Sequence, residues 1–465
     1  MRPSVTYTAA DASFSINPAT GEEIARHAYL RGDAIDHLLQ ASQSGFVVWS
    51  AMPIAQRLGV LQSMATVLRS RLEPMAQTVT QEMGKPIVQA RAEVEKCASL
   101  CDWYAQNGEA MLADEPTSIG TNAYVSYLPL GSVLGVMPWN FPYWQVMRSA
   151  VGVLLSGNAY VLKHAPNVML CAHLLADAWR VAGLPDGAFT LLHADNEGIS
   201  RAIADRRIAG VMVTGSVRAG SAIAAQAGGA LKKSVLEMGG SDPLIVLADA
   251  DIERAADAAI TGRFQNTGQV CIAAKRILLH ASIADEFLDR FVTKTKALVM
   301  GDPTRDETYL GPMARFDLRD AMAEQVRQSQ AEGAKTLLAG GIVEGRGNFY
   351  APTILADVTR SMTCFREEVF GPVASLISVR DASEALALAN DSEFGLCASL
   401  WTEDRTAAKQ FARQLQAGGL FLNSIPVSDP RVPIGGVKHS GYGRELSHFG
   451  VREFTNAQTV WFDRT

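Results

Sequence analysis

At 465 residues the chain is too long for one ordinary hydrophobic core, and its length predicts two or three domains. Apolar residues make up 48% of it, enough to build sizeable cores. The net charge of −6 comes from acids and bases scattered in both signs, which argues against nucleic-acid binding and polybasic membrane attachment.

Targeting and membrane segments do not show in the sequence pattern. Residues 1–23 contain no apolar region of the kind found in secretion signals. No segment approaches the roughly 18 consecutive uncharged apolar residues of a membrane span. We therefore expect a soluble cytoplasmic protein.

The six cysteines are spread over the chain without CxxC spacing, so reduced thiols are expected rather than a disulfide framework. Cys97 and Cys101 lie one turn apart on a predicted helix. A metal or redox pair is conceivable there, but two residues on a buried helix face are the favoured interpretation. Cys364 stands alone and the eight histidines show no ligand spacing, so no metal site is predicted.

The first hundred residues are expected to be mostly helical. Asp33 is predicted to cap a helix whose apolar residues follow the 3.6 period, namely Ile35, Leu38, Leu39, Phe46 and Trp49. The next helix repeats this period at Ile54, Leu58, Leu61, Ala65, Leu68 and Leu72.

From about residue 132 short apolar runs alternate with helical segments. The first runs are SVLGVMP, AYVLKHA, AFTLLH, AGVMVTG and SVLEMGG, and a second set after 240 includes PLIVLAD, KRILLH, VASLISV and GLFLNS. Asp251 is expected to open a helix within this second set. The alternation predicts two α/β domains with parallel sheets that face each other across a cleft, with ligands at the carboxyl ends of the strands.

Two further segments, 122–130 and 456–464, have strand-like alternation without joining the predicted sheets. Exposed strands are aggregation risks unless they are paired, and pairing between subunits would cover them. This pattern favours a homo-oligomer, a dimer or a tetramer.

Two glycine-containing turns are candidates for ligand contact. In VTGSVRAG, Gly215 and Gly220 flank the start of a helix, where backbone N–H groups could receive a phosphate, although a plain strand-to-helix turn is equally compatible. The segment GGVKHSGYG at 435–443 matches no phosphate-loop spacing. We expect it to form a turn adjacent to the active site.

Two polar side chains follow predicted strands. Glu237 ends the strand of LEMGG, where a carboxylate shielded from water would have its pKa raised toward that of a useful base. Asn140 lies in PWNFP, whose prolines fix the turn, so its side-chain amide is a candidate oxyanion donor. A salt-bridged surface Glu and an Asn bonded to its own loop are the alternatives.

Cys271 lies in an unusual setting, the short polar loop of FQNTGQVCIAAKR. The loop connects a helix to the KRILLH strand, so the thiol can face the cleft between the domains. Its thiolate is a strong nucleophile, and no His partner of the papain type is evident. A cysteine, a carboxylate, an amide donor and a dinucleotide loop together indicate redox chemistry on an acyl group.

In this order the motifs resemble the aldehyde dehydrogenase superfamily. The resemblance covers essentially the whole chain, through NPATGEE, PWNFP, VLKHAP, TGSVRAG, LEMGG, GQVC, EEVFGPV and YGRE. The segments KHAPN, GSVRAG, QNTGQVC and GRELSHFG are most similar to bacterial NAD(P)-dependent succinate-semialdehyde dehydrogenases of the shorter type. The resemblance implies a Rossmann-like cofactor domain (1–114 and 131–238), a catalytic domain (239–435), and a small β oligomerisation arm with a C-terminal segment (115–130 and 436–465).

The resemblance also implies catalytic roles. Cys271 would attack the aldehyde, and the oxyanion would lie against the Asn140 side chain and the Cys271 backbone N–H. Hydride would leave to NAD or NADP, and Glu237 would activate the water that hydrolyses the thioester. The implied cofactor-binding residues are Trp139, Lys163, Gly215, Ser216, Gly220, Glu368 and Phe370. Pro166 stands where strongly NAD-selective members carry Glu, which leaves NADP possible.

Residues for a distal substrate carboxylate are less clearly marked. Arg148 matches an arginine of the succinate-semialdehyde group, while Gln265 replaces a second arginine of that group. Ser428 and Arg431 are further candidates, and Ala273 excludes the disulfide that some relatives form beside the nucleophile. The favoured substrate is succinate semialdehyde. The alternatives are an uncharged aldehyde, a CoA-acylating reaction, which Glu237 argues against, and a non-catalytic protein with this fold.

Overall fold

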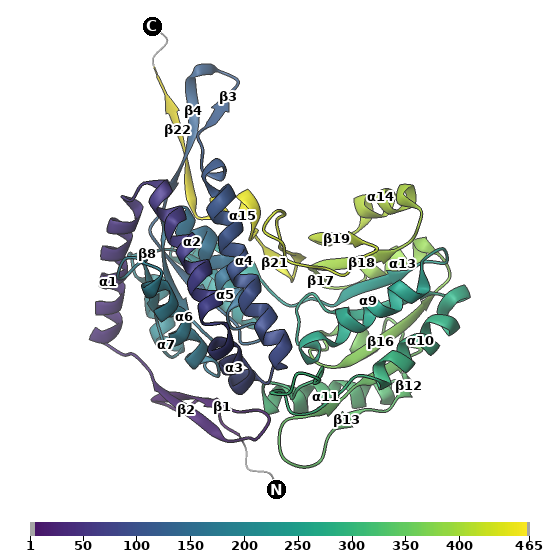
Figure 1. The fold of residues 1–465 in the computed structure, drawn as a ribbon. Helices are drawn as coiled ribbons and strands as arrows, with labels where there is room; N and C mark the ends of the chain where they lie inside the picture. The colour runs from purple at the N-terminus through teal and green to yellow at the C-terminus, as the bar shows by residue number, and fades with distance from the viewer. Residues whose placement is uncertain (1–4, 463–465) are drawn as a thin grey trace.

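The computed structural model describes residues 5–462. The chain forms two α/β lobes and a projecting three-stranded arm (Figure 1). The mixed α/β class with two largely parallel sheets, predicted from the alternating apolar runs, is confirmed.

The first lobe contains a six-stranded sheet in the order β21-β9-β8-β5-β6-β7. All neighbouring strands in it are parallel except β21, which pairs antiparallel with β9. Its strands are β5 (Ser132–Val136), β6 (Ala159–Lys163), β7 (Phe189–Leu191), β8 (Ile208–Thr214), β9 (Lys233–Glu237) and β21 (Gly441–Tyr442). Each of the five predicted apolar runs from 132 to 237 forms one of these strands.

Helices cover both faces of this sheet, as expected for doubly wound α/β folds. One face packs on α2 (Ile54–Ser70), α3 (Leu72–Met83), α4 (Ile87–Met111), α5 (Trp144–Leu155) and α6 (Met169–Val181). The other face packs on α1 (Asp33–Ser50), α7 (Asn196–Ala204) and α8 (Val217–Gly229). A hairpin of β1 (Ala12–Ile16) and β2 (Glu23–Ala28), absent from the sequence prediction, precedes these helices.

Two helix boundaries differ from prediction. The cap residue of α1 is Gly32, and Asp33 is the first helical residue rather than the cap. At that position its carboxylate still complements the positive end of the helix dipole. Leu72 begins α3 instead of continuing α2, because the chain leaves helical geometry at Arg71.

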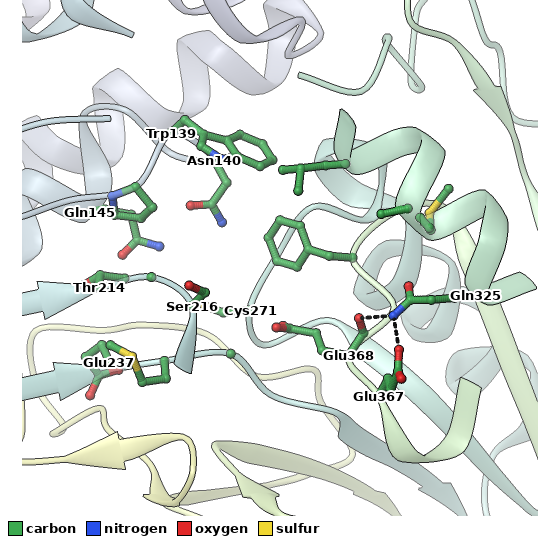
Figure 2. A pocket seen from close by; sticks show the side chains of 18 of the residues that line it. Trp139, Asn140, Gln145, Thr214, Ser216, Glu237, Cys271, Gln325, Glu367 and Glu368 are labelled. Carbon is green, nitrogen blue, oxygen red and sulfur yellow. Dashed lines mark hydrogen bonds between the residues drawn. The ribbon is translucent and has the colours of Figure 1, made fainter. Parts of the chain in front are cut away.

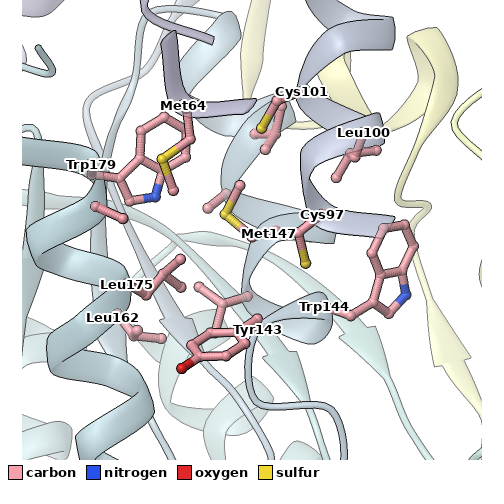
Figure 3. Packing of buried hydrophobic residues seen from close by; sticks show 14 of the residues in the cluster. Met64, Cys97, Leu100, Cys101, Tyr143, Trp144, Met147, Leu162, Leu175 and Trp179 are labelled. Atoms are coloured by element: carbon pink, nitrogen blue, oxygen red, sulfur yellow. The ribbon is translucent and has the colours of Figure 1, made fainter. Parts of the chain in front are cut away.

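The largest core cluster lies between α4, α5 and the neighbouring helices (Figure 3). Cys97 and Cys101 are both fully buried in it, together with Met64 and Met147. The interpretation of the two cysteines as residues of a buried helix face is therefore confirmed. This packing fixes α4 against α5, the helix that follows the Asn140 turn.

The second lobe contains a seven-stranded sheet in the order β12-β15-β16-β11-β10-β18-β19, in which only β12 is antiparallel. Its strands are β10 (Asp242–Val246), β11 (Ala274–His280), β12 (Lys335–Leu338), β15 (Thr353–Ala356), β16 (Val373–Val379), β18 (Cys397–Trp401) and β19 (Gly419–Leu422). One face packs on α9 (Ile252–Phe264) and α10 (Ala284–Lys296). The other packs on α11 (Phe316–Ala331), α12 (Thr363–Arg366), α13 (Ala382–Asn390) and α14 (Arg405–Gln414).

The predicted opening of α9 is confirmed, since the Asp251 side chain accepts a hydrogen bond from the Arg254 N–H.

Short elements complete the fold. They are the 3-10 turns Gln265–Gly268 and Ala281–Ile283, β13 (Gly341–Ile342) with β14 (Tyr350–Ala351), β17 (Phe394–Gly395) with β20 (Val437–Lys438), and α15 (Ser447–Glu453).

The arm pairs the two isolated strand segments with each other. β4 (Gly120–Pro129) lies antiparallel between β3 (Glu115–Thr117) and β22 (Thr455–Trp461), and the arm projects from the first lobe (Figure 1). The strand predictions are confirmed over the described residues, and positions 463–464 of the predicted tail lie outside them. β3 and β22 remain as edges, and large apolar side chains on the arm are exposed: Ile119, Leu128, Trp461 and Phe462.

Residues 5–462 contain neither a membrane-spanning helix nor a metal-binding cluster. No helix in that range is both long and apolar enough to cross a membrane. Within the same residues, no group of three His, Cys, Asp or Glu side chains is arranged to hold a metal ion.

Candidate active site

Cys271 lies where two cavities meet. It follows the 3-10 turn Gln265–Gly268 and precedes β11, and its side chain is half-buried. The larger cavity, about 550 Å³, also exposes Asn140 and Glu237 (Figure 2). The smaller one, about 190 Å³, extends from Cys271 toward α4 and the loop at 425–428. The thiol can therefore be reached from both sides, as a nucleophile between a cofactor and a substrate must be.

The loop before Cys271 is held in a strained conformation. Asn266 and Thr267 both have left-handed backbones, with φ of 52° and 54°, which is uncommon for Asn and a clear outlier for β-branched Thr. The Thr267 hydroxyl donates to the Gly311 carbonyl at 3.1 Å. Gly268 also has positive φ, and a Cβ there would collide with the Gly371 carbonyl. Strain of this kind persists only where surrounding contacts enforce it, and it is common at functional sites.

A buried arginine enforces this loop. Arg263, at the end of α9, is fully buried and donates from Nη2 to the carbonyls of Gly268, Val369 and Gly371. Burial lowers the pKa of its guanidinium to about 9. Arg263 thus connects the nucleophile loop to the segment that carries Glu368 and Phe370. Sequence reasoning missed it, since nothing in the chain marks an arginine at a helix end as buried.

Asn140 is directly linked to the same loop. Its side-chain N–H donates to the backbone carbonyl of Gln269 at 3.0 Å. The backbone carbonyl of Asn140 accepts from the Asn266 side-chain amide at 2.8 Å. Asn140 is only 4% exposed. An amide group has two N–H donors, so one remains for a ligand in the cavity. The predicted oxyanion donor and the predicted nucleophile therefore belong to one hydrogen-bonded unit.

The turn that carries Asn140 is anchored from α4. The Glu93 carboxylate accepts from the backbone N–H groups of Tyr143 and Trp144, at 2.8 and 3.0 Å, and forms a buried ion pair with Lys85. The Lys85 ammonium lies 3.6 Å from the centre of the Phe141 ring. These contacts fix the start of α5, and with it the position of the Asn140 turn.

Glu237 ends β9, as predicted, and is 3% exposed. Arg148 from α5 is 3.9 Å from its carboxylate and forms an ion pair with Glu445. Burial raises the pKa of Glu237 to about 8, with Arg148 opposing this rise and Glu445 adding to it. A carboxylate with a pKa near the working pH is suited to take a proton from water.

The segment 435–443, predicted to form a turn next to the active site, lies beside Glu237. Gly441 pairs with Glu237 across β21 and β9. A Cβ at Gly435, where φ is 155°, would lie 2.8 Å from the Glu237 carboxylate. Glycine at position 435 therefore leaves room for that side chain.

Cys271 is not pre-ionised by its surroundings. Burial raises the pKa of its thiol, while Arg148 and Lys275 reduce the rise. Lys275 donates to the carbonyls of Val270 and Cys271, at 2.9 and 2.5 Å, and forms an ion pair with Glu368 at 3.1 Å. The thiol thus needs a base, and Glu237 lines the same cavity.

Most of the implied cofactor residues line the larger cavity. Trp139 and Phe370 both line it and meet edge to face, with ring centres 5.8 Å apart, and Gly215 also borders it. Figure 2 shows Trp139, Ser216 and Glu368 around the same cavity. Ser216 caps α8 by accepting from the Ala219 N–H at 3.3 Å.

The two glycines of this turn have different environments. The Gly215 N–H is already donated to the Glu237 carbonyl. Gly220 does not border the cavity, because it packs against Met238, where a Cβ would clash. Its cofactor role stays a prediction, since its observed contact is helix-to-strand packing.

Lys163 and Pro166 border a separate cavity of about 320 Å³ near the end of β6. Burial lowers the pKa of Lys163 to about 8. Within residues 5–462 this ammonium has no hydrogen bond or ion pair, so it is available to a polar ligand. A half-buried cation without a partner, the N-terminus of α8 and the edge-to-face pair of Trp139 and Phe370 fit a dinucleotide.

The substrate candidates divide into two groups. Arg148, Gln265 and Ser428 all line the smaller cavity with Cys271. Arg431 does not line it, since its exposed guanidinium is bound to Asp429 at 2.6 Å.

Comparisons with known proteins identify the family that the sequence motifs resemble. A family model described as "Aldehyde dehydrogenase family" matches residues 7–460. The chain belongs to the aldehyde dehydrogenase family. It is 57% identical over 461 residues to "Succinate semialdehyde dehydrogenase [NAD(P)+] Sad" of Escherichia coli, with 99% of this chain and 100% of that protein covered. The resemblance inferred from the sequence motifs is confirmed.

Two further relatives agree. "Succinate-semialdehyde dehydrogenase [NADP(+)] 1" of Mycobacterium tuberculosis is 44% identical over 451 residues, which cover 96% of this chain and 99% of that protein. The crystal structure of a succinic semialdehyde dehydrogenase from Streptococcus pyogenes in complex with NADP+ superposes with a TM-score of 0.94 at 33% identity, covering 97% of this chain and 100% of that one.

Proposed function

We propose that this aldehyde dehydrogenase oxidises succinate semialdehyde to succinate, with NAD or NADP as the oxidant. The observation that carries the proposal is Cys271 between two cavities, with Asn140 and Glu237 bordering the larger one. The names of the Escherichia coli and Mycobacterium tuberculosis relatives support the substrate and the two cofactors.

In the first half of the reaction the Cys271 sulfur adds to the aldehyde carbon. The resulting oxyanion is stabilised by the free N–H of the Asn140 amide and by the Cys271 backbone N–H, a type of interaction worth about 2.7–4 kcal/mol. Glu237 is the group available to receive the thiol proton, and it must pass that proton to solvent before it can act as a base again. A nicotinamide cofactor held in the larger cavity would supply the hydride acceptor, and loss of the hydride would leave an acyl thioester on Cys271.

In the second half Glu237 takes a proton from water, and the water oxygen attacks the thioester carbon. The Asn140 amide again stabilises the oxyanion, because the reacting oxygen occupies the same place. Collapse of this state breaks the carbon–sulfur bond and releases the carboxylic acid, and the proton that Glu237 took from water passes to the Cys271 thiolate to restore the thiol. The buried position of Glu237, which raises its pKa to about 8, makes it a competent base for this step.

Cofactor contacts are proposed from the family resemblance, and the residues that line the two cavities support them. Lys163 would contact the adenosine ribose, Ser216 and Gly215 the pyrophosphate, and Glu368 and Phe370 the nicotinamide ribose and ring, while Trp139 packs nearby. Pro166 presents no carboxylate to repel a 2′-phosphate, which supports use of both NAD and NADP.

Arg148 is better suited to hold Glu237 than to bind the substrate. Its guanidinium forms an ion pair with Glu445 and lies 3.9 Å from Glu237, so two buried carboxylates already face its charge. Gln265 and Ser428 remain as polar neighbours for the substrate in the smaller cavity.

The division of the chain and its assembly are also proposals. The first lobe would bind the cofactor and the second would carry the nucleophile, with boundaries at 1–114, 131–238 and 239–435. The exposed apolar side chains of the arm support a homo-oligomer in which arm edges are covered. Six free cysteines are compatible with a reducing, cytoplasmic compartment.

The test is formation of NADH and NADPH from succinate semialdehyde, glutarate semialdehyde and propanal in the absence of CoA. We expect turnover without CoA and a higher kcat/KM for succinate semialdehyde than for propanal. Equal use of propanal would favour an uncharged substrate. Turnover only with CoA would favour acyl transfer to CoA, and no turnover at all would favour a non-catalytic protein.

A further inference from the structure

Lys96, a residue that sequence reasoning passed over, lines the smaller cavity. It comes from α4, and the same cavity is bordered by Trp144, Ser428 and Cys271. The Lys96 ammonium lies 4.0 Å from the centre of the Trp144 ring, a cation–π contact that holds the long side chain in place. Figure 3 shows Trp144 at the edge of the core cluster, next to the helix that carries Cys97.

Lys96 differs from the other charged residues of this cavity. Glu93 is engaged by Lys85, and Arg148 is engaged by Glu445. Lys96 has no ion pair or hydrogen bond within residues 5–462. Of the three charged residues that line this cavity, Glu93, Lys96 and Arg148, Lys96 is the one without an ion pair in the described part of the chain.

The electrostatics of the position point the same way. Desolvation, with a smaller contribution from the neighbouring Arg148, lowers the pKa of Lys96 to about 8, while Glu93 and Asp429 counteract this. Lys96 as a whole is exposed, so its side chain lines the cavity without being enclosed by it. An anion bound beside the ammonium would favour its charged form.

Substrate geometry brings a carboxylate to this wall. In succinate semialdehyde two methylene groups separate the aldehyde carbon from the carboxylate, so an aldehyde placed at Cys271 keeps its charge within the same small cavity. We propose that Lys96 binds the distal carboxylate of the substrate and sets the preference for a semialdehyde over an uncharged aldehyde. This inference rests on the proposed function and adds the residue that recognises the substrate's charge.

The test compares Lys96→Met and Lys96→Arg with the wild-type enzyme on succinate semialdehyde and on pentanal, an uncharged aldehyde of similar length. Lys409→Met, on the exposed side of α14, is the matched control for loss of a lysine. For Lys96→Met we expect KM for succinate semialdehyde to rise about tenfold to a hundredfold, as for loss of a hydrogen bond to a charged group, with pentanal kinetics little changed. Lys96→Arg should restore most of the lost affinity.

The outcomes separate this inference from the proposed function. If the wild-type enzyme prefers succinate semialdehyde but Lys96→Met changes both aldehydes equally or neither, the role of Lys96 is overturned and the proposed function stands. If the wild-type enzyme shows no preference for succinate semialdehyde over pentanal, both are overturned.

Discussion

Replacing Arg148 by Met tests how the buried charges set the basicity of Glu237. Arg148 is 3% exposed and 3.9 Å from the Glu237 carboxylate. At that distance, with an effective dielectric constant of about 20, the attraction is about 4 kcal/mol, or about 3 pKa units. Without the guanidinium, the pKa of Glu237 should rise from about 8 by about two to three units.

The assay is hydrolysis of 4-nitrophenyl acetate without cofactor, with the deacylation rate followed against pH. Glu237 acts as a base only when ionised, so the wild-type rate should rise with pH through a midpoint near 8. In Arg148→Met the midpoint should move to higher pH, and the rate near neutrality should fall by about a hundredfold or more. Arg148→Lys, which keeps the charge, should shift it much less.

Removing Arg148 alone leaves two buried carboxylates, so the variant's fold is checked by thermal unfolding. The double variant Arg148→Met/Glu445→Gln removes the second carboxylate, which contributes to the raised pKa of Glu237, and should bring the midpoint partly back. Folded Arg148→Met enzyme with an unchanged midpoint would refute the assignment of Arg148 as the residue that holds Glu237.

Three further changes probe the rest of the site. Asn140→Ala should lower kcat/KM for succinate semialdehyde by about a hundredfold to a thousandfold through loss of the oxyanion donor, and steady-state rates with unchanged cofactor affinity check this. Pro166→Glu should lower kcat/KM for NADP relative to NAD, because a carboxylate would repel the 2′-phosphate; an unaltered ratio would show that this position does not face the ribose. Gly268→Ala should lower the midpoint of thermal unfolding and reduce activity, since its φ is positive and a Cβ would meet the Gly371 carbonyl, whereas Gly59→Ala, in open space on α2, should not.

The sequence predicted the parts of the site that lie at strand ends. Glu237 ends β9 and Asn140 follows β5, two parallel strands on either side of β8, and in such a sheet the carboxyl ends lie at one edge. Cys271 was predicted because a cysteine in a polar loop is unusual. These three residues needed only local pattern and the α/β rule.

Other functional residues depend on contacts between distant segments. Arg148 was predicted as a substrate ligand, and its partner Glu445 comes from the far end of the chain. Arg263 and Lys275 act by binding backbone carbonyls, which no residue pattern encodes. Lys96 resembled any helix-surface lysine until α4 was placed beside α5. The cap of α1 was misplaced by one residue because Gly32 and Asp33 both favour helix starts.

The most direct test of the central claim is peptide mass spectrometry of the Glu237→Gln enzyme after mixing with succinate semialdehyde and NAD or NADP. Slow hydrolysis in this variant should let the acyl thioester accumulate. A succinyl group on the peptide that contains Cys271, formed only with oxidised cofactor, is the result we predict. A cofactor-dependent adduct on another cysteine, or none despite hydride transfer to the cofactor, would contradict the mechanism.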